Sequence, residues 1–233
     1  IVKSTGAVTT LAGSTSLGST DATGTSARFR LPREITTDGT NLYVADRDNH
    51  KIRKIVISTG VVTTIAGSGS SGSTDGTGTS AKFNYPAGIT TDGTNLYVGD
   101  RSNYTIRKIV ISTGAVTTLA GSPGSSGSTD GTGTAARFNI PRGITTDGTN
   151  LYVVDSSNHK IRKIVIATGA VTTLAGSTSA GSSDGTGTAA KFSNPREIST
   201  DGKNLYVADS ANHKIRKIVI ATGVVTTLAG SGS

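Results

Sequence analysis

Residues 34–67 read EITTDGTNLYVADRDNHKIRKIVISTGVVTTIAG, and close versions of this stretch follow three more times along the chain. Four runs rich in β-branched and aromatic residues are separated by the turn residues of DGTN, RDN and TG. Such runs favour strands, and turns this short make neighbouring strands pair as antiparallel hairpins. Each repeat is therefore predicted to form a four-stranded antiparallel meander.

The repeats are regular in length. Four landmarks, Asp21, Phe29, Pro32 and Asp38, return at Asp75, Phe83, Pro86 and Asp92, at Asp130, Phe138, Pro141 and Asp147, and at Asp184, Phe192, Pro195 and Asp201. We expect residues 1–233 to form a single repeat domain, with a partial blade at 1–13 and full repeats at 14–67, 68–121, 122–176 and 177–230. The landmarks return every 54 or 55 residues, and repetition on this scale indicates a solenoid or a propeller.

The strands favour a propeller. Runs such as VVTTIA at 61–66 place apolar groups on both faces, as expected for a sheet that lies between two neighbours. Hairpin turns fit a radial arrangement of four-stranded sheets better than a rod of parallel strands. The predicted fold is an all-β propeller with single helical turns at TSARF, TSAKF, TAARF and AAKFS, where Phe83 and Phe138 fill the gaps between blades.

Composition excludes several kinds of chemistry. The 233 residues include 31 glycines but no cysteine, methionine or tryptophan, so disulfides, thiolate zinc sites and cysteine nucleophiles are excluded. No apolar run reaches the roughly 18 residues that span a bilayer. Ile1 follows no initiator Met or signal segment, which we interpret as a mature fragment or an engineered protein.

The second repeat carries a family resemblance. The ordered residues are Pro86, Gly88, Ile89, Asp92, Gly93, Asn95, Leu96, Tyr97, Val98, Asp100 and Asn103, and the position that follows is His50, His159 or His213 in the other repeats. This pattern resembles the NHL repeat over essentially the whole chain. The resemblance implies a β-propeller, commonly six-bladed, in a family of binding modules, RNA-binding domains and a few lyases and hydrolases. The chain departs from the pattern at Glu34 and Glu197, where Gly is usual, and at Tyr104, which replaces His.

The count of blades is uneven. The outer-strand motif GxVTTxAG begins at Gly6, Gly60, Gly114, Gly169 and Gly223, while the other three strands occur four times each. A four-bladed ring that used the first copy would leave the last copy unpaired, and an unpaired strand edge promotes association. We therefore expect a fragment of a longer array, or a ring that a second copy completes as a homo-oligomer. The near identity of the repeats indicates recent amplification or design.

Residues present in every repeat are interpreted as structural. Asp and Asn side chains accept backbone hydrogen bonds in turns, so we assign a turn role to Asp46, Asn49, Asp100, Asn103, Asp155, Asn158, Asp209 and Asn212. The three histidines lie one per repeat, too far apart to share a zinc ion, so they are expected to pack at strand ends. Asp-Gly-Thr-Gly-Thr at 75, 130 and 184 lacks the acids of a calcium loop and is interpreted as a turn or cap. We expect no metal and no cofactor.

Positions that differ between the repeats are better candidates for a site. At the start of the first strand the chain carries Arg33, Glu34, Arg142, Arg196 and Glu197, whereas other copies have Ala or Gly. The first strand is innermost in a propeller blade, so these side chains are expected to surround one mouth of the central channel. They form either a site for a zwitterionic or anionic ligand or a set of mutual salt bridges.

The net charge of +8 suggests a second class of function. KIRK at 51, 160 and 214 and TIRK at 105 are expected to form a basic outer rim that attracts nucleic acid or an acidic glycan. Aromatic residues that would stack on bases are missing beside these runs, which argues against nucleic acid. The sequence predicts a non-enzymatic scaffold or binding module for a protein or a small ligand, extracellular or on a bacterial cell surface. The alternative is a basic propeller that binds RNA or an acidic glycan.

Overall fold

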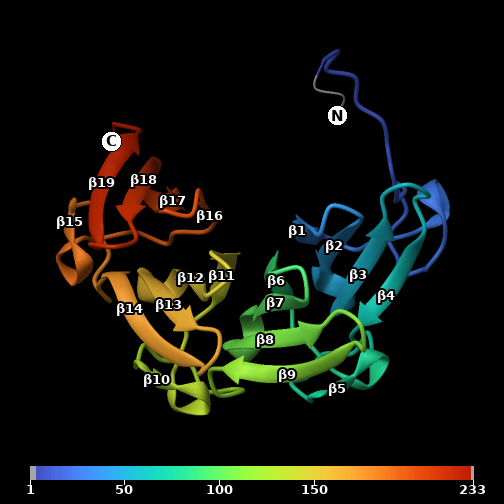
Figure 1. Cartoon of the computed structure of the whole chain (residues 1–233), viewed down its shortest axis with the longest axis horizontal. Coiled ribbons are helices and arrows are strands. Elements are labelled where there is room, and N and C mark those ends of the chain that lie inside the picture. The colour runs from blue at the N-terminus through green and yellow to red at the C-terminus, as the bar shows by residue number, and fades with distance from the viewer. Residues whose placement is uncertain (1–3, 232–233) are drawn as a thin grey trace.

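The computed structural model describes residues 4–231, which form four antiparallel sheets side by side in an arc (Figure 1). Blade 1 contains β1 (Pro32–Thr37), β2 (Asn41–Asp46), β3 (Lys51–Val56) and β4 (Val62–Ala66). Blade 2 contains β6 (Pro86–Thr91), β7 (Asn95–Asp100), β8 (Thr105–Val110) and β9 (Ala115–Ala120). Blade 3 contains β11 (Pro141–Thr146), β12 (Asn150–Asp155), β13 (Lys160–Val165) and β14 (Ala170–Gly176). Blade 4 contains β16 (Ile198–Thr200), β17 (Asn204–Asp209), β18 (Lys214–Val219) and β19 (Val224–Ala229).

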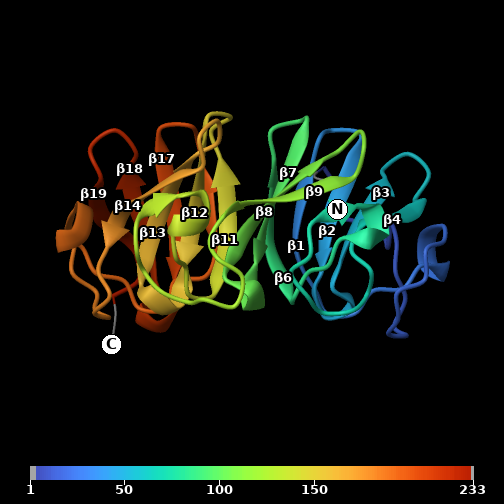
Figure 2. The same ribbon diagram turned by 90° about the horizontal axis from the view of Figure 1, so that it is seen from below.

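The blades are arranged as a propeller. In each blade the first strand lies toward the middle of the arc and the fourth strand lies at its outer edge (Figure 1). Seen from below, the strands of all four blades run across the thickness of the molecule (Figure 2). The predicted all-β propeller of four-stranded antiparallel blades is thus confirmed. The arc is open between blade 1 and blade 4 (Figure 1).

The linkers add short elements that sequence reasoning did not separate. Two-residue strands β5 (Gly76–Thr77), β10 (Gly131–Thr132) and β15 (Gly185–Thr186) pair with the outermost strands of blades 2, 3 and 4. Each linker then forms a 3-10 turn, namely η1 (Gly24–Ser26), η3 (Gly78–Ser80), η5 (Gly133–Ala135) or η7 (Gly187–Ala189). A second set follows the second strand: η2 (Arg47–Asn49), η4 (Arg101–Asn103), η6 (Ser156–Asn158) and η8 (Ser210–Asn212). The residues from 4 to 231 include no α-helix.

A fully buried arginine on the third strand holds each blade to its linker. In blade 2, Arg107 Nη1 lies 2.9 Å from Asp100 Oδ2, and Arg107 Nη2 lies 2.7 Å from Asp75 Oδ1. The same guanidinium donates to the carbonyls of Thr74 and Lys82. Arg53, Arg162 and Arg216 repeat this arrangement with their own pairs of aspartates. The turn residue Asn103 also donates to Asp100, at 2.7 Å.

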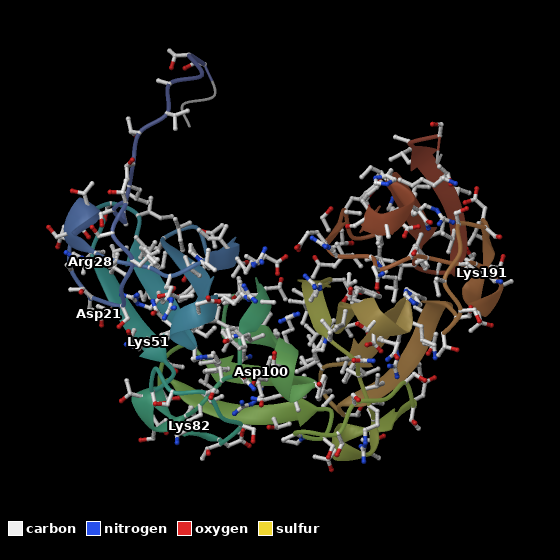
Figure 3. All side chains as sticks on the ribbon, turned by 180° about the vertical axis from the view of Figure 1, so that it is seen from behind. Asp21, Arg28, Lys51, Lys82, Asp100 and Lys191 are labelled. Carbon is white, nitrogen blue, oxygen red and sulfur yellow. The ribbon has the colours of Figure 1, made fainter. Side chains whose placement is uncertain are left out.

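The basic outer rim expected from KIRK is therefore wrong in one respect. The arginine of each run is inaccessible to solvent because an ion pair draws it inward, so the lysines are the basic residues of these runs that reach the surface. Figure 3 shows Asp100, the partner of Arg107, lying inward of Lys82 and Lys191 at the outer edge. The Asp-Gly-Thr-Gly-Thr aspartates also have a specific role, because Asp75 accepts the N–H of Thr118 on β9 at 3.1 Å and so ties the linker to the outer strand.

Apolar layers join the blades. Phe83 is buried together with Tyr43 and Ile52 of blade 1 and Ile89 and Leu96 of blade 2. It therefore fills the gap between these two blades, and Phe138 and Phe192 do the same at the next two interfaces.

The histidines also connect blades. Nδ1 of His50 accepts the N–H of Tyr85 at 3.1 Å, and Nδ1 of His159 accepts the N–H of Asn194 at 3.0 Å. Each of these histidines has a left-handed backbone just after a 3-10 turn, which aims its ring at the next linker.

The first outer-strand copy lies outside the sheets. Residues 4–13 contain no strand, although the N–H of Gly13 donates to Gly24 O at 3.1 Å. The last copy, by contrast, forms β19 and pairs with β18. The ring is not closed by the N-terminal segment, and the assignment of residues 1–13 to a partial blade stays a prediction; residues 1–3 lie outside the described part of the chain.

The buried arginines should control stability, whereas the neighbouring lysines should not. We expect Arg107→Met to lower the free energy of unfolding by about 3–5 kcal/mol, because it leaves Asp100 buried without its charge partner. Changing Lys51, Lys160 or Lys214 to Thr, the residue already present at Thr105, should alter it by less than about 0.5 kcal/mol each. Urea unfolding measures both effects, and equal losses for Arg107→Met and the lysine variants would contradict the assignment.

Candidate functional site

The charged residues that differ between repeats meet at the middle of the arc. Arg33 and Glu34 lie on β1, Arg142 lies on β11, and Arg196 and Glu197 come immediately before β16. Arg33, Arg142, Arg196 and Glu197 line one cavity of about 110 Å³, and Glu34 lies beside it in contact with Glu197. The structure thus brings together all five residues that the sequence placed at the channel mouth.

Two further arginines line the same cavity. Arg47 in η2 and Arg101 in η4 reach it from the turns that follow β2 and β7. Sequence reasoning missed them because this turn, with its repeated Asp and Asn, was interpreted as structural only. A signal was present, since Ser156 and Ser210 occupy the same position in the other two repeats.

The positive charge of this cavity is largely unpaired. Among residues 4–231, the one ion pair formed by these five arginines joins Arg47 to Asp48, at 3.3 Å. The expected alternative of mutual salt bridges between the mouth arginines and glutamates is therefore absent from this part of the chain. The Nε–H groups of Arg101 and Arg142 are buried without a protein acceptor. Burial, and then the charges of Arg101, Arg196 and Arg33, lower the pKa of the Arg142 guanidinium.

A carboxyl pair lies beside the arginines. Glu34 and Glu197 hydrogen-bond each other, and Glu34 Oε2 accepts the N–H of Ile89 at 2.6 Å. Burial and the negative charge of Glu197 raise the pKa of Glu34 to about 8. Burial also raises the pKa of Glu197, whereas the hydrogen bond from Glu34 and the nearby arginines act in the opposite direction. The hydrogen bond between the two carboxyl groups requires a proton on one of them, and the raised pKa of Glu34 makes Glu34 the donor to Glu197 near neutral pH.

Glycines in blades 2 and 3 make room for these two glutamates. A Cβ atom on Gly88 would lie 2.0 Å from Arg142 O and 3.0 Å from Glu34 Oε2. A Cβ atom on Gly143 would lie 2.7 Å from Arg196 O and 3.1 Å from Glu197 Oε2. The Gly and Glu copies of this position are therefore complementary in shape, and each Glu fills space that a Gly leaves open.

The turn residues lie apart from this cavity. Asp46, Asp100, Asp155 and Asp209 are buried in the arginine pairs of their own blades. Asn49, Asn103, Asn158 and Asn212 each bond to that aspartate and to a linker carbonyl. Within the described ranges, no three His, Cys, Asp or Glu side chains are grouped so that they could hold a metal ion. The described residues also form no helix long and apolar enough to cross a membrane.

No model of a known family matches the chain, but individual proteins do. SUPPRESSOR OF QUENCHING 1, a chloroplastic protein of Arabidopsis thaliana, is 32% identical over 93% of the chain and 22% of its own length. Human NHL repeat-containing protein 2 is 30% identical over 92% of the chain and 34% of its own length. The chain therefore spans about a fifth to a third of these curated relatives.

Solved structures share the fold at low identity. An auxiliary nutrient binding protein from Bacteroides ovatus superposes with a TM-score of 0.66 and 21% identity, over 87% of this chain and 50% of that one. A virginiamycin B lyase from Staphylococcus aureus superposes with a TM-score of 0.55 and 18% identity, over 87% of this chain and 56% of the lyase chain. Four radial blades around a charged centre define a β-propeller of sequence repeats. The relatives and the repeat pattern together show that the chain belongs to the NHL-repeat β-propeller family.

The shape complementarity at the centre can be tested by substitution. We expect Gly88→Ala to lower the free energy of unfolding by about 1–3 kcal/mol, because the new Cβ overlaps the carbonyl of Arg142. The reverse double change, Glu34→Gly with Glu197→Gly, should keep the all-β circular dichroism spectrum, because Gly88 and Gly143 already occupy the corresponding strand positions. If urea unfolding gave Gly88→Ala the stability of the wild type, this strand position would not require glycine, and the proposed complementarity in shape would be wrong.

Proposed function

We propose that the protein is a non-enzymatic binding module that holds a small anionic ligand in the arginine cavity at the centre of its blades. One observation carries this proposal: five arginines from all four blades converge on one cavity, and among residues 4–231 they form a single ion pair, between Arg47 and Asp48. Guanidinium groups present planar pairs of N–H donors that match carboxylate and phosphate oxygens. An anion would also relieve the mutual repulsion of these charges.

The size of the cavity limits the part of the ligand that enters it. A volume of about 110 Å³ compares with about 30 Å³ for one water molecule, so the cavity fits a carboxylate, sulfate or phosphate group. A neighbouring groove of about 370 Å³ shares Arg142 and Arg196 and is also lined by Ser156, Asn194 and Ser210. An uncharged part of a larger ligand would lie in this groove, where hydroxyl and amide groups supply hydrogen bonds.

A binding role is supported by the groups that line the cavity. They are arginines, Glu197 and the small residues Ala87 and Gly88, without a hydroxyl or imidazole nucleophile among them. Structural neighbours include nutrient binding proteins from two Bacteroides species, which also support our proposal of a location outside a bacterial cell or on its surface. The lyase neighbours share the fold alone.

Anion binding at this cavity should depend on its own arginines. We expect sulfate to bind at pH 7 and low ionic strength, and Arg142→Gln to weaken binding at least about tenfold, because a charge-assisted hydrogen bond contributes roughly 1.5–3 kcal/mol. Isothermal titration calorimetry measures the dissociation constant. Arg28→Gln is the matched control, since it removes the same charge from the outer edge of blade 1 (Figure 3) and should have little effect.

The Arg28→Gln control also distinguishes the proposed anion site from the alternative function, binding of RNA or an acidic glycan over the outer surface. A heparin fragment or an RNA oligonucleotide that binds with steep salt dependence, and that Arg28→Gln weakens as much as Arg142→Gln, would support polyanion binding over the outer surface. Equal, small effects of both changes on sulfate binding, or no sulfate binding by the wild type, would contradict the proposed site.

We further propose that a second copy of the chain covers the open faces of blades 1 and 4. Ile52 of blade 1 is inaccessible under blade 2, but its counterpart Ile215 in blade 4 is 41% exposed. Ile89 of blade 2 is 2% exposed, but its counterpart Ile35 in blade 1 is 53% exposed. Apolar grooves of about 290 Å³ lie on both of these faces. Each face is thus one half of an interface that the chain already forms three times internally, and a blade of the same sequence is its natural complement.

Self-association should therefore need both open faces. We expect light scattering after size-exclusion chromatography to show oligomers at tens of micromolar protein, and Ile35→Lys or Ile215→Lys to yield monomers because a charge would be buried. Thr117→Lys adds the same charge to an exposed position on the outer strand β9 and should leave the oligomers intact. A monomeric wild-type protein would contradict the proposal.

A further inference from the structure

The carboxyl pair connects blade 1 to blade 4, which are not neighbours along the arc. Glu34 belongs to β1 in blade 1, whereas Glu197 precedes β16 in blade 4, across the opening of the arc (Figure 1). The main-chain N–H of Ile89 in blade 2 donates to Glu34 Oε2 at 2.6 Å, and the N–H of Ile144 in blade 3 lies near enough to lower the pKa of Glu34. All four blades therefore fix the position of this pair.

The pair lies beside the cavity that the five arginines line. The charges of Arg142 on β11, Arg33 on β1 and Arg196 before β16 lower the pKa of Glu197. Arg47 in η2 and Arg101 in η4 line the same cavity. Within residues 4–231, no guanidinium nitrogen of these arginines lies within 4 Å of a carboxylate oxygen of Glu34 or Glu197. Glu197 itself lines the cavity, so an anion that enters lies next to its carboxylate.

An incoming anion must therefore interact with the charge of the pair. If both carboxyl groups were ionised, two negative charges would oppose the ligand inside a partly desolvated site. If Glu34 keeps its proton, one of these charges is absent and the second is shared in a hydrogen bond. Anion and proton thus favour each other's binding, and the coupling is reciprocal.

We propose that the cavity binds an oxyanion together with a proton, held between Glu34 and Glu197, and that loss of this proton releases the anion. This inference rests on the proposed function, because it concerns the same cavity. It predicts which group senses pH and in which direction. The ligand class that it names is a sulfate-, phosphate- or carboxylate-like group that is fully ionised when it binds.

The direction of the pH effect follows from the pair. Burial and the charge of Glu197 raise the pKa of Glu34 to about 8, so free protein holds the proton at pH 7 and has largely lost it at pH 9. A bound anion raises the proton affinity further. Linkage of one proton to one anion then predicts that the sulfate dissociation constant rises about tenfold between pH 7 and pH 9.

Sulfate is the probe, because it carries a constant charge of −2 throughout this range. Calorimetric titration of the full chain at pH 8, in buffers with different ionisation enthalpies, should show uptake of a fraction of a proton per sulfate bound. In Glu34→Gln the amide stays neutral at every pH, so the ratio of the dissociation constants at pH 9 and pH 7 should fall to near one. Asp92→Asn, in a turn away from the cavity, removes one acid elsewhere and should keep the tenfold ratio.

The outcomes separate the two proposals. Sulfate binding with the same affinity at pH 7 and pH 9 and without proton uptake overturns the proton coupling but leaves the binding site standing. A tenfold ratio that survives in Glu34→Gln also overturns it, because another group would then carry the proton. If Glu34→Gln does not fold, Glu197→Gln removes the negative charge that helps to raise the pKa of Glu34, so the loss of sulfate affinity should begin at a lower pH, and an unchanged pH dependence would overturn the coupling. Absence of sulfate binding at any pH overturns both proposals.

Discussion

The structure depends on one interaction repeated four times, a guanidinium buried between two aspartates. Arg107 lies out of contact with water between Asp100, which is equally buried, and Asp75 in the linker. A buried charge without partners is strongly destabilising, so each arginine requires both acids at once. This requirement joins the third strand, the end of the second strand and a linker residue more than thirty positions earlier than the arginine. It explains why a long linker rich in Gly and Ser is ordered against its blade.

The apolar contacts between blades build on this frame. Phe83 lies where the linker reaches the next interface, and its ring packs against the Arg107 guanidinium, whose Cζ lies 5.1 Å from the ring centre. Every blade carries the same two faces, so the same apolar interface forms between each pair of neighbouring blades. Ile35 of blade 1 and Ile215 of blade 4 are exposed because no neighbouring blade among residues 4–231 packs against those two faces.

Repetition ends at the centre, and the candidate site lies there. Near the axis the blades approach so closely that equivalent positions touch, so identical residues cannot all fit. Gly88 and Gly143 leave the space that the side chains of Glu34 and Glu197 occupy. The two glutamates share a proton because burial and mutual repulsion disfavour two negative charges. The arginines around them repel one another and have almost no acid partners. We base the proposed binding of an anion together with a proton on these two features.

The sequence by itself determined the period, the four strands of each repeat and the propeller, because local turn chemistry and apolar runs act over a few residues. It also indicated five of the central charges, because Arg33, Glu34 and their counterparts interrupt a near-perfect repeat. Only the tertiary structure showed that Arg53 and its copies are buried, that Arg47 and Arg101 reach the centre, and that Glu34 meets Glu197. These facts depend on through-space partners up to 163 positions apart, and electrostatic pairing at such a separation is decided by how the blades curve around their axis.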